Sequence, residues 1–173
     1  MRTLGYLGAP SSDLQTQIIQ QANAAGVPSS IALAVAQQES GFNQSAVSPV
    51  GAVGIFQLMP SSFPGQAITD ASTNISLGIA YLAQLYQKYG DWSTALAAYN
   101  WGPGNVDKSP SIPQQVQNYV SSVLGLAGSN DPSLVDDSGG DGGITAPSID
   151  LTPLLWVGGA LLGGVVLVWV LED

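Results

Sequence analysis

The segment from Ala34 to Phe63 reads AVAQQESGFNQSAVSPVGAVGIFQLMPSSF and contains the end of one helix and the start of a long loop. The run that begins at Ser30 is apolar on every side through its middle, which is typical of a helix at the centre of a fold. Gly41 stands where a helix-ending residue in the left-handed conformation is expected. We therefore predict a central helix over residues 30–40, followed by a loop rich in Gly, Ser and Pro.

The other segments before residue 128 also have helical periodicity. A helix is predicted to begin near Ser12, which has capping-box spacing to Gln15, and Asp91 is the expected N-cap of a helix that reaches Tyr99. Apolar side chains recur at helical spacing in three groups: Leu14, Ile18, Ile19, Ala22 and Ala25; Ile75, Ile79, Leu82, Tyr86 and Tyr89; Val116, Tyr119, Val120 and Val123. No segment alternates as a strand would. The predicted fold class is mostly α, with one domain over residues 1–127.

The composition excludes several kinds of chemistry. The 173 residues include no His and no Cys, so the usual zinc ligands, a Ser–His or Cys–His nucleophile and a disulfide framework are missing. There are 3 Lys and Arg against 12 Asp and Glu, too few cations for a nucleic-acid-binding surface. We expect no metal, no cofactor and no nucleic-acid partner.

The C-terminal part differs in composition from the rest. Residues 128–150 hold five Gly, five Asp and no aromatic residue, which predicts a flexible linker. Residues 151–171 carry no charge and would span about 31 Å as a helix, so we predict a transmembrane helix with the lipid bilayer as partner. Gly159 and Gly163 have the spacing that lets two such helices associate, although glycine is common in membrane helices. Self-association is left open.

Glu39 is the only glutamate before the predicted linker, since the chain's other glutamate is Glu172. It falls in the last turn of the predicted central helix, where the helix dipole and partial desolvation both raise a carboxyl pKa. A carboxyl that keeps its proton near neutral pH suits the cleavage of a glycosidic bond. From its position alone, Glu39 is more simply interpreted as a solvated residue on a surface turn. The surrounding sequence favours a catalytic role instead.

Three motifs follow one another in a fixed order from Glu39 onward. They are Glu39-Ser40; Gly54-Ile55-Phe56-Gln57-Leu58-Met59-Pro60, with Gly51 before it; and Ala98-Tyr99-Asn100 with Gly102. In this combination the sequence resembles the lytic transglycosylases of the SLT-domain superfamily, which have a goose-lysozyme-like fold. The predicted linker and membrane helix lie outside the resemblance.

The resemblance implies an enzyme that acts on the glycan strands of peptidoglycan, with Glu39 as its catalytic residue. Glu39 would protonate the leaving oxygen of the β-1,4 bond between N-acetylmuramic acid and N-acetylglucosamine. It would then deprotonate the muramyl C6 hydroxyl, which attacks C1 and leaves a 1,6-anhydro end. One carboxylate suffices because the nucleophile is internal, unlike the two-carboxylate pattern of most glycosidases. For Asp70, the next acidic residue, we expect a turn or capping role.

The same resemblance assigns substrate-binding roles to matched positions. Gln57 would hydrogen-bond sugar N-acetyl or hydroxyl groups, Met59 would line the cleft floor, and Tyr99 would point its hydroxyl at Glu39. Packing is the alternative for each, most of all for Met59 and Tyr99. Trp101 stands where the family commonly has Ala, and would either stack on a sugar ring or fill a groove.

Three more positions complete the expected substrate-binding set. Asn100 would bind the saccharide, and Ser40 would help position the sugar or cap the helix end. Tyr119 is retained from a family segment in which Glu-Thr usually stands in place of Gln115 and Val116. The family's acidic partner is therefore a neutral amide here, which bears on the fine tuning of Glu39 but not on its role as general acid.

The expected place of action poses a topology problem, because peptidoglycan lies outside the cytoplasmic membrane and the first 13 residues show no export signal. We expect a single-pass protein in the internal membrane of a phage virion, which opens the cell wall locally during genome entry. A bacterial envelope protein exported by a signal-less route is the alternative. Virion or envelope proteins would then be partners.

Two other functions stay open from the sequence. One is a non-catalytic, membrane-anchored protein that binds glycan or has a structural role in a virion or envelope. The other is a lysozyme that hydrolyses the same bond with water.

Overall fold

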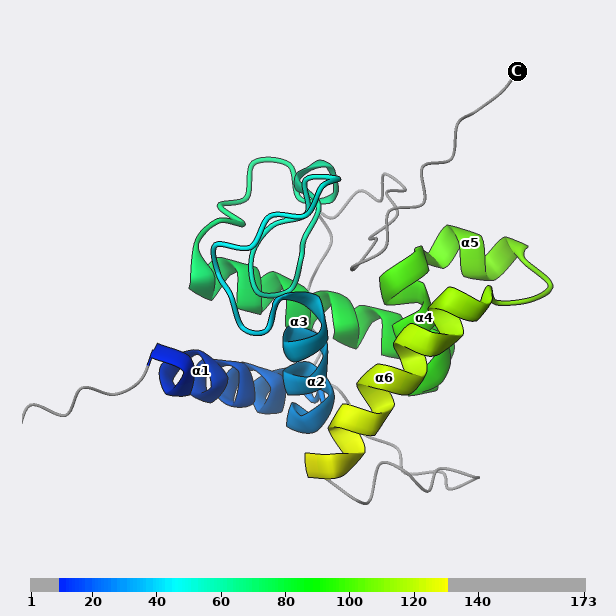
Figure 1. Cartoon of the computed structure of the whole chain (residues 1–173), viewed down its shortest axis with the longest axis horizontal. Coiled ribbons are helices and arrows are strands. Elements are labelled where there is room, and N and C mark those ends of the chain that lie inside the picture. Colours follow the sequence, from blue (N-terminus) through cyan, green and yellow to red (C-terminus); the bar gives the residue numbers. More distant parts are fainter. Residues whose placement is uncertain (1–9, 131–173) are drawn as a thin grey trace, which may run out of the picture.

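The computed structural model describes residues 10–130, which form six α-helices and a short 3₁₀ helix (Figure 1). The elements are α1 (Pro10–Ala25), α2 (Ser29–Ser40), η1 (Pro60–Ser62), α3 (Ala71–Tyr89), α4 (Trp92–Trp101), α5 (Pro103–Lys108) and α6 (Gln114–Asn130). Most of the predicted linker and all of the predicted transmembrane helix lie outside the described residues. Within residues 10–130, no helix is both long enough and apolar enough to cross a membrane. The mostly α fold class is confirmed for this part of the chain.

Helix α2 is central, as its sequence predicts. It packs against α1 on one side and α6 on the other. The buried side chains of α2 include Ile31, Val35 and Ala36, each with 0% exposure. At its end Gly41 has φ 61° and donates its N–H to the Gln37 carbonyl at 3.0 Å, which confirms the predicted helix stop. This stop leaves the last turn of α2 at the edge of the core.

Two aspartates begin α3 and α4, which pack against each other. The Asp70 carboxylate accepts the Thr73 N–H at 2.9 Å at the start of α3, and Asp91 accepts the Thr94 N–H at 2.7 Å at the start of α4. A side-chain acceptor at this position satisfies an N–H that has no partner within the helix. The capping role expected for Asp70 and the N-cap expected for Asp91 are confirmed.

The N-terminal helix differs from its prediction. Helix α1 begins at Pro10 and not near Ser12, since proline is well tolerated in the first turn of a helix. Ile19 was expected on the buried face with Ile18, but Ile19 is 37% exposed and Ile18 is 0% exposed. Successive helical residues point about 100° apart, so the core covers one of the two and not the other.

The C-terminal helices also extend past the predicted limits. Helix α4 continues to Trp101, and α5 was not predicted because its six residues are too few to show a periodicity. Helix α6 continues to Asn130, one turn past the predicted domain end at residue 127. Ala127 is still fully buried there, so the helix is held against the core at that point.

The long loop between α2 and α3 lies over the C-terminal end of α2 (Figure 1). It contains two isolated antiparallel bridges, from Val47 to Val53 and from Val53 to Leu58, and residues 41–70 form no strand. Figure 1 shows α5 on the other side of the α2 end from this loop. The last turn of α2 is therefore flanked by the loop and by the C-terminal helices.

The loop is anchored on α3 through direct contact of Phe56 with Gly78. A Cβ added to Gly78 would lie 2.4 Å from the Phe56 Cγ, closer than packed atoms tolerate. We expect Gly78→Ala to lower the free energy of unfolding by about 1–3 kcal/mol through overpacking, although alanine favours helix. Gly125→Ala in α6 is the control, because a Cβ there meets nothing within 4 Å. It should raise stability by about 0.5–1 kcal/mol. Urea denaturation of both variants measures the difference, and equal effects would contradict the packing argument.

Candidate active site

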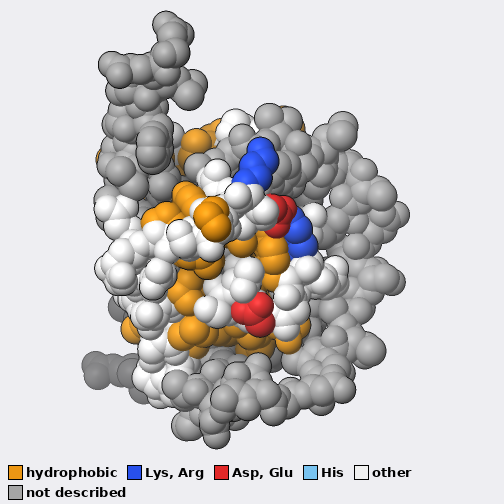
Figure 2. All heavy atoms as spheres, turned by 90° about the vertical axis from the view of Figure 1, so that its right-hand side faces the viewer, with side chains coloured by type: hydrophobic (Ala, Val, Ile, Leu, Met, Phe, Trp, Pro, Cys, Tyr) orange, Lys and Arg blue, Asp and Glu red, His pale blue; other side chains and the backbone are white. Residues whose placement is uncertain are grey.

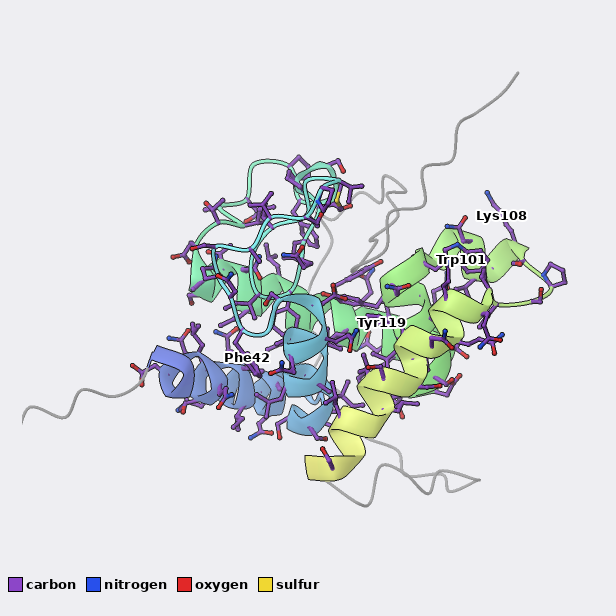
Figure 3. All side chains as sticks on the ribbon, viewed as in Figure 1. Phe42, Trp101, Lys108 and Tyr119 are labelled. Carbon is purple, nitrogen blue, oxygen red and sulfur yellow. The ribbon has the colours of Figure 1, made fainter. Side chains whose placement is uncertain are left out.

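The carboxyl of Glu39 lies in the last turn of α2, partly buried between α2 and α6. The Tyr119 hydroxyl, from α6, donates a hydrogen bond to Glu39 Oε1 at 2.6 Å. Figure 3 shows Tyr119 reaching from α6 toward the end of α2. The two residues are 80 positions apart in the sequence and are brought together by the packing of α6 on α2.

Burial of Glu39 raises its pKa from 4.5 to about 7, and the hydrogen bond from Tyr119 lowers it in part. Removal from water disfavours the carboxylate, whereas a phenol that donates to it favours the charged form. The balance leaves the carboxyl close to half protonated at neutral pH. The group therefore holds a proton that it can give up and take back, which is what general acid–base catalysis requires.

The other candidate carboxyl, Asp70, is in a different environment. It is exposed, and its hydrogen bonds with the N–H and hydroxyl of Thr73 lower its pKa. It is a helix cap and an ionised group. Among the described residues, no three His, Cys, Asp or Glu side chains group in a way that would hold a metal ion.

Tyr99 is nearly completely buried, and its hydroxyl donates to the Phe56 carbonyl at 2.7 Å. We expected this hydroxyl to point at Glu39, and its hydrogen bond goes to the backbone of the loop. Burial, with a smaller contribution from the nearby Glu39 carboxylate, raises the Tyr99 pKa well above 10. Tyr99 thus lies close to Glu39 while it holds the loop, and Tyr119 makes the hydrogen bond.

Ser40 serves the helix end and the loop. Its hydroxyl donates to the Ile55 carbonyl at 2.9 Å and accepts the Asn43 N–H at 3.1 Å. Of the two roles expected for Ser40, positioning the sugar or capping the helix end, these hydrogen bonds agree with capping. They also tie the residue next to Glu39 directly to the loop that carries Gln57.

Gln57 is 6% exposed and has φ 46°, in the left-handed region that non-glycine residues rarely adopt. Its amide nitrogen donates to the Gly54 carbonyl at 2.8 Å and the Ala46 carbonyl at 3.3 Å. The nitrogen is thus engaged with the loop, and within the described residues the amide oxygen makes no hydrogen bond. Met59 is partly buried, packs on the core, and is the N-cap residue directly before η1.

Asn100 is the expected site residue whose polar group is least engaged. Its exposure is only 7%, yet its carboxamide forms no hydrogen bond with any residue of the described range 10–130. A largely covered amide without a protein partner is suited to bind a ligand group. Trp101 is partly buried beside α5 (Figure 3), and its carbonyl accepts the Asn105 amide at 2.5 Å.

One residue of the site region was missed by sequence reasoning. Asn74 in α3 is fully buried and hydrogen-bonds the backbone of the loop before Gln57. In the sequence it reads as one more polar residue in the first turn of a helix. Only its alignment with the buried face, between Ala71 and Gly78 and next to Ile75, hinted at its burial.

Comparison with solved structures defines the class of protein. The chain is similar to the 70 kDa soluble lytic transglycosylase solved in complex with bulgecin A, with a TM-score of 0.62 and 28% identity. The match covers 78% of this chain and 25% of that one. The described part therefore has the helical, lysozyme-like fold of lytic transglycosylases.

Residues 16–120 match the model of the family described as the transglycosylase SLT domain, and the chain belongs to this family. It is 42% identical over 95 residues to the soluble lytic murein transglycosylase of Escherichia coli K12, a match that covers 46% of this chain and 15% of the relative. It is 36% identical over 100 residues to the transglycosylase of Enterobacteria phage PRD1, covering 54% of this chain and 38% of the relative. The chain thus spans well under half the length of these relatives.

Proposed function

We propose that the chain is a peptidoglycan lytic transglycosylase that cleaves the β-1,4 bond between N-acetylmuramic acid and N-acetylglucosamine. The observation that carries the proposal is the partly buried Glu39 carboxyl, with its pKa near 7 and a phenol bonded to one oxygen. It lies in a chain of the transglycosylase SLT domain family, whose relatives are named for this activity. The substrate is the glycan strand.

The first step is proton donation by Glu39. Because Oε1 accepts the Tyr119 hydroxyl, the carboxyl proton belongs on Oε2, which makes no hydrogen bond with residues 10–130 and would face the glycosidic oxygen. Transfer of this proton lets the bond from C1 to the leaving oxygen break. Tyr119 then stabilises the carboxylate that forms, through a charge-assisted hydrogen bond.

In the second step the Glu39 carboxylate removes the proton of the muramyl C6 hydroxyl. The C6 oxygen attacks C1 and closes a 1,6-anhydro ring, so Glu39 ends the cycle protonated and no water is consumed. A single carboxyl serves both steps, which agrees with the helix-capping role of Asp70. Asn100, Gln57 and Met59 bind the sugar in this scheme, whereas Ser40 and Tyr99 hold the loop.

The surface agrees with a largely uncharged ligand. Within residues 10–130 the only cations are Lys88 and Lys108, and Lys88 is paired with Asp107 at 2.6 Å. Figure 2 shows the face nearest α5, where charged side chains are few among polar and apolar ones. Hydrogen bonding and apolar contact, and not charge, would recognise the glycan.

The membrane and virion assignments are part of the same proposal. Residues 151–171 anchor the chain in a bilayer, residues 131–150 act as a tether, and the enzyme opens the wall during phage genome entry. The similarity to the phage PRD1 transglycosylase and the uncharged C-terminal run support this. Detection of the chain in purified, detergent-sensitive virions tests it, and virions that lack the chain would contradict it.

Mass spectrometry of the products tests the activity. The full chain, in mild detergent, is incubated with purified peptidoglycan, and the released muropeptides are weighed. We expect 1,6-anhydro ends. Reducing ends, about 18 Da heavier by one water, would make the chain a hydrolase. No release by a folded chain that binds the peptidoglycan would instead support a glycan-binding protein.

Tyr119→Phe is expected to move the pH dependence of the rate. Loss of a donor that lowers the Glu39 pKa should shift the alkaline limb of kcat/KM upward by about 1–2 pH units. Tyr89→Phe is the control, because its hydroxyl bonds Asp107 at 2.9 Å and does not contact Glu39. An unshifted limb in the Tyr119 variant would contradict the assigned role.

A further inference from the structure

Asn74 is a buried polar side chain that the proposed mechanism does not use. Its exposure is 0%, and its carboxamide makes three hydrogen bonds. Oδ1 accepts the Phe56 N–H at 2.8 Å, and Nδ2 donates to the carbonyls of Val53 at 3.0 Å and Ile68 at 2.9 Å. All three partners are backbone groups of the loop between α2 and α3. Among the residues that the structure describes, the Asn74 side chain therefore hydrogen-bonds only the loop.

Two other side chains hold the same loop from different helices. Ser40 of α2 donates to the Ile55 carbonyl at 2.9 Å, and Tyr99 of α4 donates to the Phe56 carbonyl at 2.7 Å. With Asn74 of α3, three helices each fix a backbone group within residues 53–56. Backbone held at so many points has little freedom to relax.

Gln57 follows this held segment directly and has φ 46°. A non-glycine residue in the left-handed region is strained, and such strain persists only where the surroundings over-determine the conformation. The bonds to residues 53–56 supply that constraint. The hydrogen bonds to residues 53–56 are therefore a structural cause of the strained backbone at Gln57, and they fix the position of the Gln57 side chain.

We infer that Asn74 is a positioning residue, which holds residues 53–57 in the conformation that presents Gln57 to the substrate. The inference rests on the proposed function, in which Gln57 binds a sugar. A carboxamide is needed because the loop offers one donor and two acceptors to a single side-chain end. Aspartate lacks the donors and serine has only one. A longer glutamine does not fit, since a Cβ at Gly54 would already lie 2.4 Å from Asn74 Nδ2.

Two glycines of the loop offer a matched test that leaves Asn74 itself unchanged. Gly54 and Gly51 have similar φ values, 78° and 88°, so alanine strains the backbone at both. The new Cβ collides with Asn74 only at Gly54, because at Gly51 it meets nothing within 4 Å. We expect Gly54→Ala to release muropeptides at least 10-fold more slowly than Gly51→Ala, with both folded. Equal rates would overturn the inference.

A double-mutant cycle tests whether Asn74 acts through Gln57. Asn74→Ser and Gln57→Ala are made singly and together in the full chain. We expect Asn74→Ser to lower the rate about 10-fold and Gln57→Ala to lower it about 10- to 100-fold. The rate of the double variant should lie within about 3-fold of the Gln57→Ala rate, because the effects of coupled residues are not additive. Losses that multiply, or no loss with Gln57→Ala, would overturn the inference. Ile18→Ala, in the core of α1, controls for lost stability and should leave the rate unchanged below its melting temperature.

The same double-mutant cycle is repeated in the Glu39→Gln background, and the quantity measured is the affinity for a peptidoglycan tetrasaccharide. Non-additive losses of affinity support the inference even if the wild-type chain releases nothing. In that case the proposed activity fails and the positioning role stands. Additive losses of affinity beside an active wild-type enzyme would overturn the positioning role alone.

Discussion

We expect the Glu39→Gln variant to release soluble fragments from peptidoglycan about 10²- to 10⁴-fold more slowly than the wild type. The amide oxygen of glutamine still accepts the Tyr119 hydroxyl, but the side chain has no proton of suitable acidity to transfer. The fold should therefore be retained while both catalytic steps are lost. The initial rate of fragment release at pH 6–7 measures the effect.

Asp70→Asn is the control for this prediction. Asparagine caps helices as well as aspartate does, and Asp70 is exposed with its carboxylate committed to Thr73. We expect an unchanged rate. Equal loss of activity in both variants would show that two carboxyls are needed, and an active Glu39→Gln enzyme would contradict the assignment of Glu39.

The second large effect is on stability, and it follows from the raised pKa of Glu39. The folded-state pKa is about 7 and the ordinary value is 4.5, so between these pH values the folded chain binds more protons than the unfolded chain. Stability therefore falls as pH rises through this window. By linkage, the folded wild type loses about 3 kcal/mol from this group between pH 4 and pH 8.

Glu39→Gln removes this loss because glutamine does not titrate. The difference in free energy of unfolding between the variant and the wild type is measured at pH 4 and at pH 8. Relative to its value at pH 4, this difference should shift by about 3 kcal/mol in favour of the variant at pH 8. Urea denaturation of both proteins at the two pH values gives the four free energies. A difference between variant and wild type that does not change with pH would mean that Glu39 has an ordinary pKa.

Much of the fold could be predicted because its signals are local. Asp91 and Gly41 mark helix ends through bonds to residues three or four positions away, so a short stretch of sequence contains the whole interaction. The ordered motifs around Glu39 predicted the family, which the match over residues 16–120 confirms. Short α5 has too few residues to carry such a signal.

The partners within the site could not be predicted, because they depend on packing between distant segments. Tyr99 and Tyr119 are both retained tyrosines, and only the way α6 packs on α2 decides that Tyr119 reaches Glu39. Asn74 likewise lies 18 positions from Phe56, and no pattern in the sequence near either residue predicts their hydrogen bond. The predicted linker and membrane helix stay predictions from composition.

An NMR titration of the Glu39 carboxyl in the full wild-type chain tests most directly whether Glu39 is the general acid. Carbon-13 labelling of glutamate gives two side-chain carboxyl signals, from Glu39 and Glu172, and the Glu39→Gln variant assigns them. We expect Glu39 to titrate at about pH 7, because its burial disfavours the charged form. A Glu39 carboxyl that titrates near its ordinary value of 4.5 would contradict its role as general acid, because the group would then be ionised at the pH where it must donate a proton.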